Sequence, residues 1–329
     1  MRRLKSAERL IETLFQRSGA PMLQAYRGYA DPNHLVLQGR VLSAVRRDAP
    51  DPDQSRWTNF KEMASLFFTS EVADVPVRAD GVTARSNAEG YVTLKLPRPA
   101  DAAGWLSVDA ELAEAPDTRV AMPALVPKPE ARFGVISDID DTMMMTGAHS
   151  LARNLWTTFT GNALTRRVFP DSKALMDRLA EEGRNPVYYV SSSPWNLHAF
   201  LDKVFARAGL VPGPMFLRDL GISDDGVVGA SHQNHKGAAV DTILSANPGL
   251  AFFLLGDTGQ KDAQVYLDAV KRFPGRIRAV LLREPVARTN RKALEALLEI
   301  EALGVPTYHG RNFSDLPARV LPGVTGDIR

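Results

Sequence analysis

The chain has 329 residues, 44% hydrophobic and 24% charged, and its 40 basic and 38 acidic side chains leave a net charge of +2. This length and composition predict a soluble protein of two domains, and the near-neutral charge argues against a dedicated nucleic-acid binder. The chain has no cysteine, which excludes disulfides, thiolate metal sites and cysteine nucleophiles and fits a cytoplasmic location.

Residues 1–20 carry apolar side chains at helical spacing with arginines and a lysine around them, which predicts an amphipathic helix. Its charges exclude a secretory signal, and no run of 18 apolar residues predicts a transmembrane helix. Two interpretations remain open: the helix packs on its own domain, or it lies on an anionic membrane. Packing is favoured, because most amphipathic helices cover a core.

Residues 21–127 read mostly as β-strands. One helix interrupts them, with Trp57, Phe60, Ala64 and Phe67 on a single face. Strand patterns lie at residues 34–44, 75–97, 105–112 and 119–126, and the second segment is expected to hold two strands around a turn at 87–90. Because these strands follow one another without helices between most of them, they predict a small antiparallel, sandwich-like domain. The charged, proline-containing stretch 127–132 predicts a linker.

Residues 128–329 show a different rhythm, in which apolar strands alternate with helices. The strands are predicted at 133–137, 186–190, 251–255 and 277–282. Continuous apolar strands of this kind predict a Rossmann-like parallel sheet covered by helices on both faces. The segment 146–169 is longer than an ordinary strand-to-helix loop and is expected to form a flap over the site, with a short helix near 149–160. The tail 286–329 adds a helix around Leu294.

Polar side chains cluster where these strands end. Because ligands bind beyond the carboxyl ends of parallel strands, these side chains are expected to share one crevice. The residues are Asp138, Asp140 and Thr142 after the first strand, Ser191 after the second, Asp257 and Asp262 after the third, and Lys236 in the helix before the third. Carboxylates, a hydroxyl group and one cation suit phosphoryl transfer with Mg²⁺. A divalent cation among the aspartates makes their crowding tolerable.

The residues also carry a resemblance. DIDDT at 138–142 resembles the DxDxT signature of haloacid-dehalogenase (HAD) phosphatases, and Ser191, Lys236 and GDTGQKD resemble that superfamily's second, third and fourth motifs in order. TFTGNALTRRVFP, YYVSSSPWNL and LLGDTGQKDAQVY are similar to the phosphatidate phosphatase family first known from actin patches, over about residues 133–285. The resemblance implies a HAD-type catalytic domain and a Mg²⁺-dependent phosphatase. The implied substrate is a phosphomonoester, phosphatidate, which would give diacylglycerol and phosphate.

The resemblance also implies roles for single residues. Asp138 would attack the phosphorus and form an aspartyl-phosphate, and Asp140 would protonate the leaving oxygen and then activate water. Ser191 would hydrogen-bond the phosphoryl group, Lys236 would balance its charge and Thr142 would brace the loop. The implied ligands of Mg²⁺ are Asp138, the backbone carbonyl of Asp140 and Asp257, with Asp262 close by.

Four residues are candidates for substrate contact: Ser192, Trp195, Thr165 and Arg166. Ser191 is preferred to Ser192 for the second motif because it is the first residue past the strand. Trp195 is either an ordinary anchor at a helix start or a substrate-facing side chain. Thr165 and Arg166 either reach a phosphate or headgroup, or are solvated and pair with local acids.

Three alternative functions stay open. The same chemistry could act on a soluble phosphomonoester; the chain could be a phosphorylatable switch; or it could be a binding protein in which the phosphatase fold is silent. Asp140 argues against the switch, because such domains lack a general acid two residues after the phosphorylated aspartate. The complete motif set argues against a silent fold. The basic helix at 1–20 is the expected point of any peripheral membrane contact.

Overall fold

The computed structural model describes residues 20–43, 72–145, 168–218, 232–285 and 290–324. The predicted N-terminal helix, the helix around Trp57 and nearly all of the predicted flap lie outside these residues. Among the described helices, none is long and apolar enough to cross a membrane.

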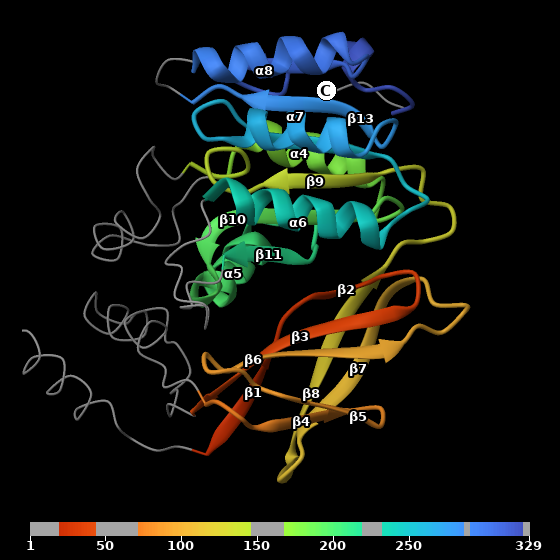
Figure 1. The fold of residues 1–329 in the computed structure, drawn as a ribbon, viewed down its shortest axis with the longest axis vertical. Coiled ribbons are helices and arrows are strands. Elements are labelled where there is room, and N and C mark those ends of the chain that lie inside the picture. Colours follow the sequence, from red (N-terminus) through yellow and green to blue (C-terminus); the bar gives the residue numbers. More distant parts are fainter. Residues whose placement is uncertain (1–19, 44–71, 146–167, 219–231, 286–289, 325–329) are drawn as a thin grey trace, which may run out of the picture.

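A six-stranded parallel sheet forms the C-terminal part of the molecule (Figure 1). Its strands are β9 (Gly134–Asp138), β10 (Val187–Pro194), β11 (Met215–Arg218), β12 (Phe252–Asp257), β13 (Ile277–Arg283) and β14 (Thr307–Gly310). The order is β11-β10-β9-β12-β13-β14, so the chain starts in the middle, runs to one edge and then continues on the other side of β9. The predicted parallel α/β sheet is confirmed. The sequence prediction missed the edge strands β11 and β14, which have only four residues each.

Helices cover both faces of this sheet. They are α4 (Pro170–Ala180), α5 (His198–Ala208), α6 (His232–Ala246), α7 (Asp262–Arg272) and α8 (Arg291–Ala302). One apolar cluster joins α4 and α5 to the sheet, and another joins α6, α7 and α8 to it. Val135 belongs to the first cluster and its neighbour Ile136 to the second, as expected when successive side chains of a strand face opposite ways. The strand therefore places apolar side chains on both faces of the sheet before it ends in Ser137 and Asp138.

The N-terminal strands form a second sheet. They are β1 (Pro21–Ala25), β2 (Gly28–Ala30), β3 (His34–Ser43), β4 (Pro76–Ala79), β5 (Val82–Arg85), β6 (Tyr91–Pro97), β7 (Gly104–Leu112) and β8 (Ala115–Val126). The strand order is β1-β3-β2-β8-β7-β4-β5, and β6 pairs with β3. Because β3 has ten residues, it pairs with β6 along one edge and with β1 and β2 along the other. The result is one continuous sheet around an apolar core rather than two separate sheets, and a separate N-terminal domain remains a prediction.

The segment 75–97 contains three strands instead of the two expected from the sequence. Asp80 and Gly81 separate β4 from β5, and both have positive φ angles, 43° and 78°. An Asp-Gly pair in this conformation makes the tight turn of a two-residue hairpin. The alternating pattern before Asn87 therefore belongs to a hairpin, for which Asp-Gly was the available signal.

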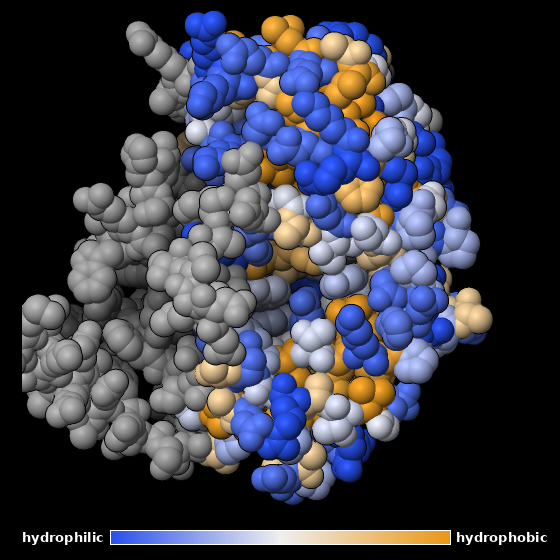
Figure 2. Space-filling model, in the orientation of Figure 1, coloured by the Kyte–Doolittle hydropathy of each residue, from blue (hydrophilic) through white to orange (hydrophobic). Residues whose placement is uncertain are grey.

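The described surface mixes hydrophilic and hydrophobic residues on the face that Figure 2 shows. Large apolar side chains that are exposed among the described residues are Met22, Trp105, Met145, Leu298 and Leu303. Leu298 lies on α8, and Leu303 ends that helix. The prediction of a helix around Leu294 is confirmed by α8.

Candidate active site

The ends of neighbouring parallel strands bring the predicted acidic residues together. Asp138 is the last residue of β9 and Asp257 the last residue of β12, which pairs directly with β9. Asp262 is the first residue of α7, which follows β12 after a short loop. All three side chains are buried, with exposed fractions of 1%, 1% and 0%. Burial of three carboxyl groups in one place calls for compensating charge.

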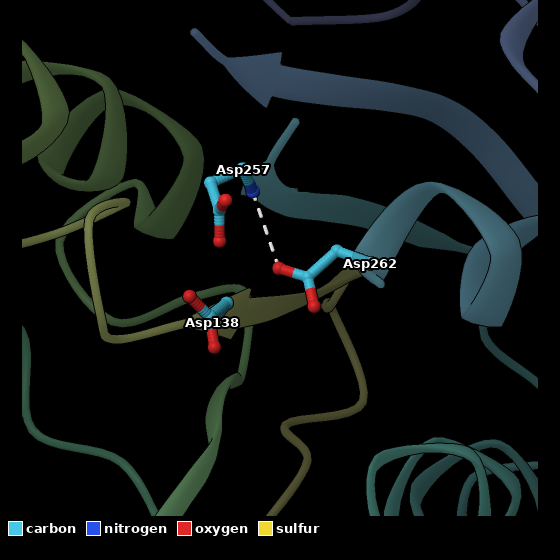
Figure 3. Close-up of side chains that lie close together, drawn as sticks. All are labelled: Asp138, Asp257 and Asp262. Atoms are coloured by element: carbon cyan, nitrogen blue, oxygen red, sulfur yellow. Dashed lines mark hydrogen bonds between the residues drawn. The ribbon is translucent and has the colours of Figure 1, made fainter. Parts of the chain in front are cut away.

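The carboxyl groups of Asp138, Asp257 and Asp262 point into a common space (Figure 3), and one oxygen from each lies within 4.8 Å of the others. The backbone N–H of Asp257 donates to Oδ2 of Asp262 over 3.2 Å, which fixes α7 against the end of β12. A Cβ atom on Gly256 would lie 2.7 Å from that same Oδ2 atom. Glycine at 256 therefore permits the close approach of Asp262 to the strand.

Lys236 supplies the positive charge. It lies on α6, is 5% exposed, and its Nζ donates to Oδ1 of Asp138 over 2.7 Å and to Oδ1 of Asp262 over 2.5 Å. A longer bond of 3.3 Å reaches Oε1 of Gln260. The ammonium group therefore holds two of the three acids in place, and it approaches the carboxyl group predicted to attack phosphorus.

Asp140 is held by two serines of β10. Ser191 Oγ donates to Oδ2 of Asp140 over 2.7 Å, and Ser193 Oγ donates to the same oxygen over 3.1 Å. The other oxygen, Oδ1, is buried and has no hydrogen-bond partner among the described residues. One oxygen of Asp140 is thus fixed, while the other is left available to exchange a proton with a bound group.

Sequence reasoning missed Ser193. Ser191 and Ser193 are both buried and reach Asp140, while Ser192 between them is half-buried. Side chains alternate along a strand, so the first and third serines of Ser-Ser-Ser share one side. The period of two was the signal that could have identified Ser193, had β10 been predicted to continue past Val190.

Thr142 connects the loop after β9 to the acidic group. Its Oγ1 donates to Oδ2 of Asp138 over 3.1 Å, and its backbone carbonyl accepts from Ser172 Oγ at the start of α4 over 2.7 Å. Asp141, which lies between Asp138 and Thr142 in the chain, adopts a left-handed conformation with φ of 56°, which turns the chain sharply. These contacts place Thr142 between the loop and Asp138, and its role in bracing the loop stays a prediction.

Gln260 was also not anticipated. Its backbone N–H and that of Gly259 donate to Oδ1 of Asp257 over 2.8 and 2.7 Å. Its side-chain Nε2 lies 3.5 Å from the backbone carbonyl of Asp140. The loop after β12 therefore orients Asp257 through two backbone donors and touches the predicted carbonyl ligand.

Burial raises the pKa of three of these acids, which works against their charged forms. Burial raises the pKa of Asp138 well above its usual value, with Lys236 opposing the effect. Burial raises the pKa of Asp140 as well, against the hydrogen bond from Ser191. Burial and the neighbouring Asp262 raise the pKa of Asp257 to about 8. Burial opposes the charge on Lys236, but Asp138, Asp262 and Asp257 together raise its pKa.

We expect the metal-free protein to lose stability as the pH rises from about 4 to about 8. The pKa of Asp257 is about 8 in the folded chain against its ordinary value of 3.8, so the folded state binds the extra proton over that range. The free energy of unfolding then falls with pH. Urea unfolding in EDTA at several pH values measures this slope, and Asp257→Asn should make it less steep. A free energy that rises over this range would contradict the assignment.

The donor set fits a divalent cation. Asp257 Oδ2 is buried without a hydrogen-bond partner among the described residues, and it belongs to the group of three converging carboxyl groups. Oxygen ligands of this kind suit a hard cation such as Mg²⁺. Asp138, Asp257 and Asp262 are thus candidate ligands, together with the backbone carbonyl of Asp140.

Two of the four candidate substrate residues lie among the described residues. Trp195 lies in the turn η2 (Trp195–Leu197) directly after β10, where its ring stacks on Tyr26 at 5.1 Å and on His198 at 5.8 Å. This position favours the anchor interpretation. Ser192 lies on β10 beside the serines that reach Asp140, and Thr165 and Arg166 lie outside the described residues.

Comparisons with known proteins agree on the C-terminal part of the chain. Residues 133–284 match the family described as phosphatidate phosphatase APP1, catalytic domain. The chain is 29% identical over 151 residues to phosphatidate phosphatase APP1 of Saccharomyces cerevisiae, covering 46% of this chain and 26% of that protein. It is 25% identical over 153 residues to an uncharacterized protein of Schizosaccharomyces pombe, covering 46% and 25%. The chain thus spans about a quarter of the length of these relatives.

A solved structure provides a weaker likeness. The cobalt-bound form of deoxy-D-mannose-octulosonate 8-phosphate phosphatase from Haemophilus influenzae aligns at 15% identity with a TM-score of 0.28. The alignment covers 58% of this chain and 96% of that one. The sequence matches, rather than this alignment, bear on the role of the site.

Proposed function

We propose that residues 133–284, which match the phosphatidate phosphatase APP1 catalytic-domain family, form a Mg²⁺-dependent phosphatase. The observation that carries the proposal is the arrangement around Asp138. The buried carboxyl group of Asp138 is paired with the ammonium group of Lys236 and lies beside the carboxyl groups of Asp257 and Asp262. Two residues later, Asp140 has one carboxyl oxygen without a hydrogen-bond partner among the described residues. These groups supply a nucleophile, charge compensation and a proton donor for phosphoryl transfer.

In the first step, a carboxylate oxygen of Asp138 attacks the phosphorus atom of a phosphomonoester. The bond between phosphorus and the leaving oxygen breaks, and Asp140 gives its proton to that oxygen. Burial raises the pKa of Asp140, which favours the protonated form that a general acid needs. Ser191 and Ser193 fix the orientation of Asp140 by holding its Oδ2 atom.

In the second step, Asp140 accepts a proton from water as the water oxygen attacks phosphorus. The bond between phosphorus and Asp138 breaks, and inorganic phosphate leaves. Lys236 lies 2.7 Å from Asp138 and balances negative charge on the transferred group in both steps. The same residues thus serve both half-reactions, and Asp138 and Asp140 return to their starting forms.

Mg²⁺ is proposed to be held by Asp138, Asp257 and the backbone carbonyl of Asp140, with Asp262 completing the group. When bound, it supplies positive charge that stabilises the oxygens of the transferred phosphoryl group. Asp262 already accepts bonds from Lys236 and from the backbone of Asp257. Its main contribution is therefore to orient those two groups.

Phosphatidate is the proposed substrate, and its hydrolysis would give diacylglycerol and phosphate. The support is the family of residues 133–284 and the activity named for the yeast relative. Contact of residues 1–20 with a membrane and a cytoplasmic location remain part of this proposal. A soluble phosphomonoester is the alternative for the same site.

The proposal is tested by measuring phosphate release from dispersed phosphatidate and from soluble sugar and nucleotide phosphates, with Mg²⁺ and with EDTA. Release from phosphatidate is expected with Mg²⁺ and should fall by roughly two to three orders of magnitude in EDTA. Release only from a soluble ester would retain the mechanism and overturn the lipid substrate. Release from nothing in the panel would overturn the proposed activity.

A further inference from the structure

Aromatic side chains of the N-terminal sheet contact the turn that follows β10. Tyr26, directly after β1, stacks on Trp195 with 5.1 Å between ring centres and 17° between the planes. The same tyrosine ring lies 4.2 Å from His198, the first residue of α5. Tyr91 of β6 lies 6.2 Å from Trp195 on a tilted plane. A tyrosine next to β1 and a tyrosine of β6 therefore meet a single tryptophan in the turn after β10.

This tryptophan is only two residues away from the serines of the site. Ser193, Pro194 and Trp195 follow one another at the end of β10. The backbone N–H of Ser193 donates to Ser191 Oγ over 2.9 Å, and both hydroxyl groups reach Asp140. A shift of Trp195 would also displace Ser193, because Pro194 between them restricts the backbone.

The tyrosine side of the contact is itself held firmly. The backbone N–H of Tyr26 donates to the carbonyl of Gln38 in β3 over 2.8 Å. A Cβ atom on Gly28 would lie 2.2 Å from the carbonyl oxygen of Val36, so only glycine lets this segment lie so close to β3. Arg27 forms an ion pair with Asp202 of α5. Within three residues the segment is thus tied to β3 of its own sheet and to α5 of the C-terminal part.

We infer that Tyr26 is a positioning residue for the phosphatase site: through Trp195, it holds the end of β10, and with it Ser191 and Ser193, in the place that orients Asp140. Tyr91 supports the same ring from a second strand, and the guanidinium group of Arg40 lies over Tyr91 at 4.5 Å. The effect on turnover rests on the proposed function, whereas the effect on the end of β10 does not. The N-terminal sheet would then be required for catalysis without touching the substrate.

The test compares Tyr26→Leu with the wild type in two measurements. Hydrogen exchange of peptides covering residues 189–197 should be faster in Tyr26→Leu, because the hydrogen bond from Ser193 N–H to Ser191 is less well held. With Mg²⁺ and p-nitrophenyl phosphate as a small substrate, kcat should fall between about tenfold and a hundredfold while KM changes little. A thermal unfolding curve shows that the variant is folded.

Two further variants separate positioning from general damage. Tyr26→Phe keeps the stacked ring, so its hydrogen exchange at 189–197 and its kcat should equal those of the wild type. Tyr29→Leu is the matched control, since its ring also crosses the junction but meets Phe216 of β11, at 5.3 Å, instead of the turn after β10. It should leave the exchange of 189–197 and kcat near those of the wild type.

The inference is overturned if Tyr26→Leu leaves the exchange of 189–197 unchanged, if exchange rises without a fall in kcat, or if Tyr29→Leu has equal effects. A wild-type protein that hydrolyses no phosphomonoester would overturn the proposed function separately. In that case the exchange measurement alone decides whether Tyr26 holds the end of β10.

Discussion

Asp138→Asn is expected to reduce phosphate release by roughly 10⁴-fold or more, because removal of a covalent nucleophile removes the step on which the others depend. The amide keeps the size of the carboxyl group but cannot attack phosphorus. Phosphate release with Mg²⁺, measured on the best substrate of the panel, provides the comparison. Asp177→Asn is a matched control, since Asp177 forms an exposed ion pair with Lys173 on α4.

This loss of activity should not be a loss of folding. Burial raises the pKa of Asp138, so the folded chain disfavours its charge, and a neutral side chain relieves that penalty while Lys236 keeps its ion pair with Asp262. In EDTA at pH 8, the unfolding midpoint of Asp138→Asn should therefore equal or exceed that of the wild type. If Asp138→Asn is active, Asp138 is not the nucleophile. If Asp138→Asn is unfolded, the expected effect on stability is wrong.

Lys236→Met should have the largest effect on stability. It removes the only cation that the described residues place between Asp138 and Asp262, while nearly keeping the length of the side chain. Breaking a buried pair by removing one partner costs about 3–5 kcal/mol, because a buried charge is left without compensation. The variant should also lose most of its activity. Urea unfolding at pH 8 in EDTA measures the change in the free energy of unfolding.

Mg²⁺ provides the decisive control for this variant. A cation bound among the acids replaces part of the missing charge, so Mg²⁺ should raise the unfolding midpoint of Lys236→Met if the site still binds it. Lys271→Met is the matched substitution, since Lys271 pairs with Glu299 on the surface and should change stability by at most about 1 kcal/mol. Equal losses in both lysine variants would contradict the electrostatic account.

The parts of the fold predicted best are those with the strongest local pattern. β9, β10, β12 and β13 are buried on both faces and read as continuous apolar runs, so their positions were predicted to within one or two residues at the start of each strand. The edge strands β11 and β14 have four residues each and lack such a run. The hairpin at Asp80 and Gly81 was hidden because its two strands together resemble one.

The site was predictable to the extent that its residues stand at strand ends. Asp138 and Asp257 meet because β9 and β12 are neighbours. The sequence predicts that the strand ends share one crevice, but it does not give this strand order. Ser193 required the additional knowledge that β10 continues to Pro194. The contact of Tyr26 with Trp195 could not be predicted, because it joins residues 169 positions apart through packing between two sheets. Local patterns carry no information on such a contact.

If Asp138 carries the phosphoryl group during turnover, rapid acid quenching should trap the phosphorylated aspartate. Asp140→Asn is used, because without the group that activates water the phosphorylated enzyme should accumulate; p-nitrophenyl phosphate is used because its leaving group needs no proton. We expect one phosphoryl group, located by mass spectrometry on the peptide that contains Asp138. It should form with Mg²⁺ and not in EDTA, and it should be absent from the double variant that also carries Asp138→Asn. A phosphoryl group on another residue, or phosphate released with none found on the protein at any time, would contradict this expectation.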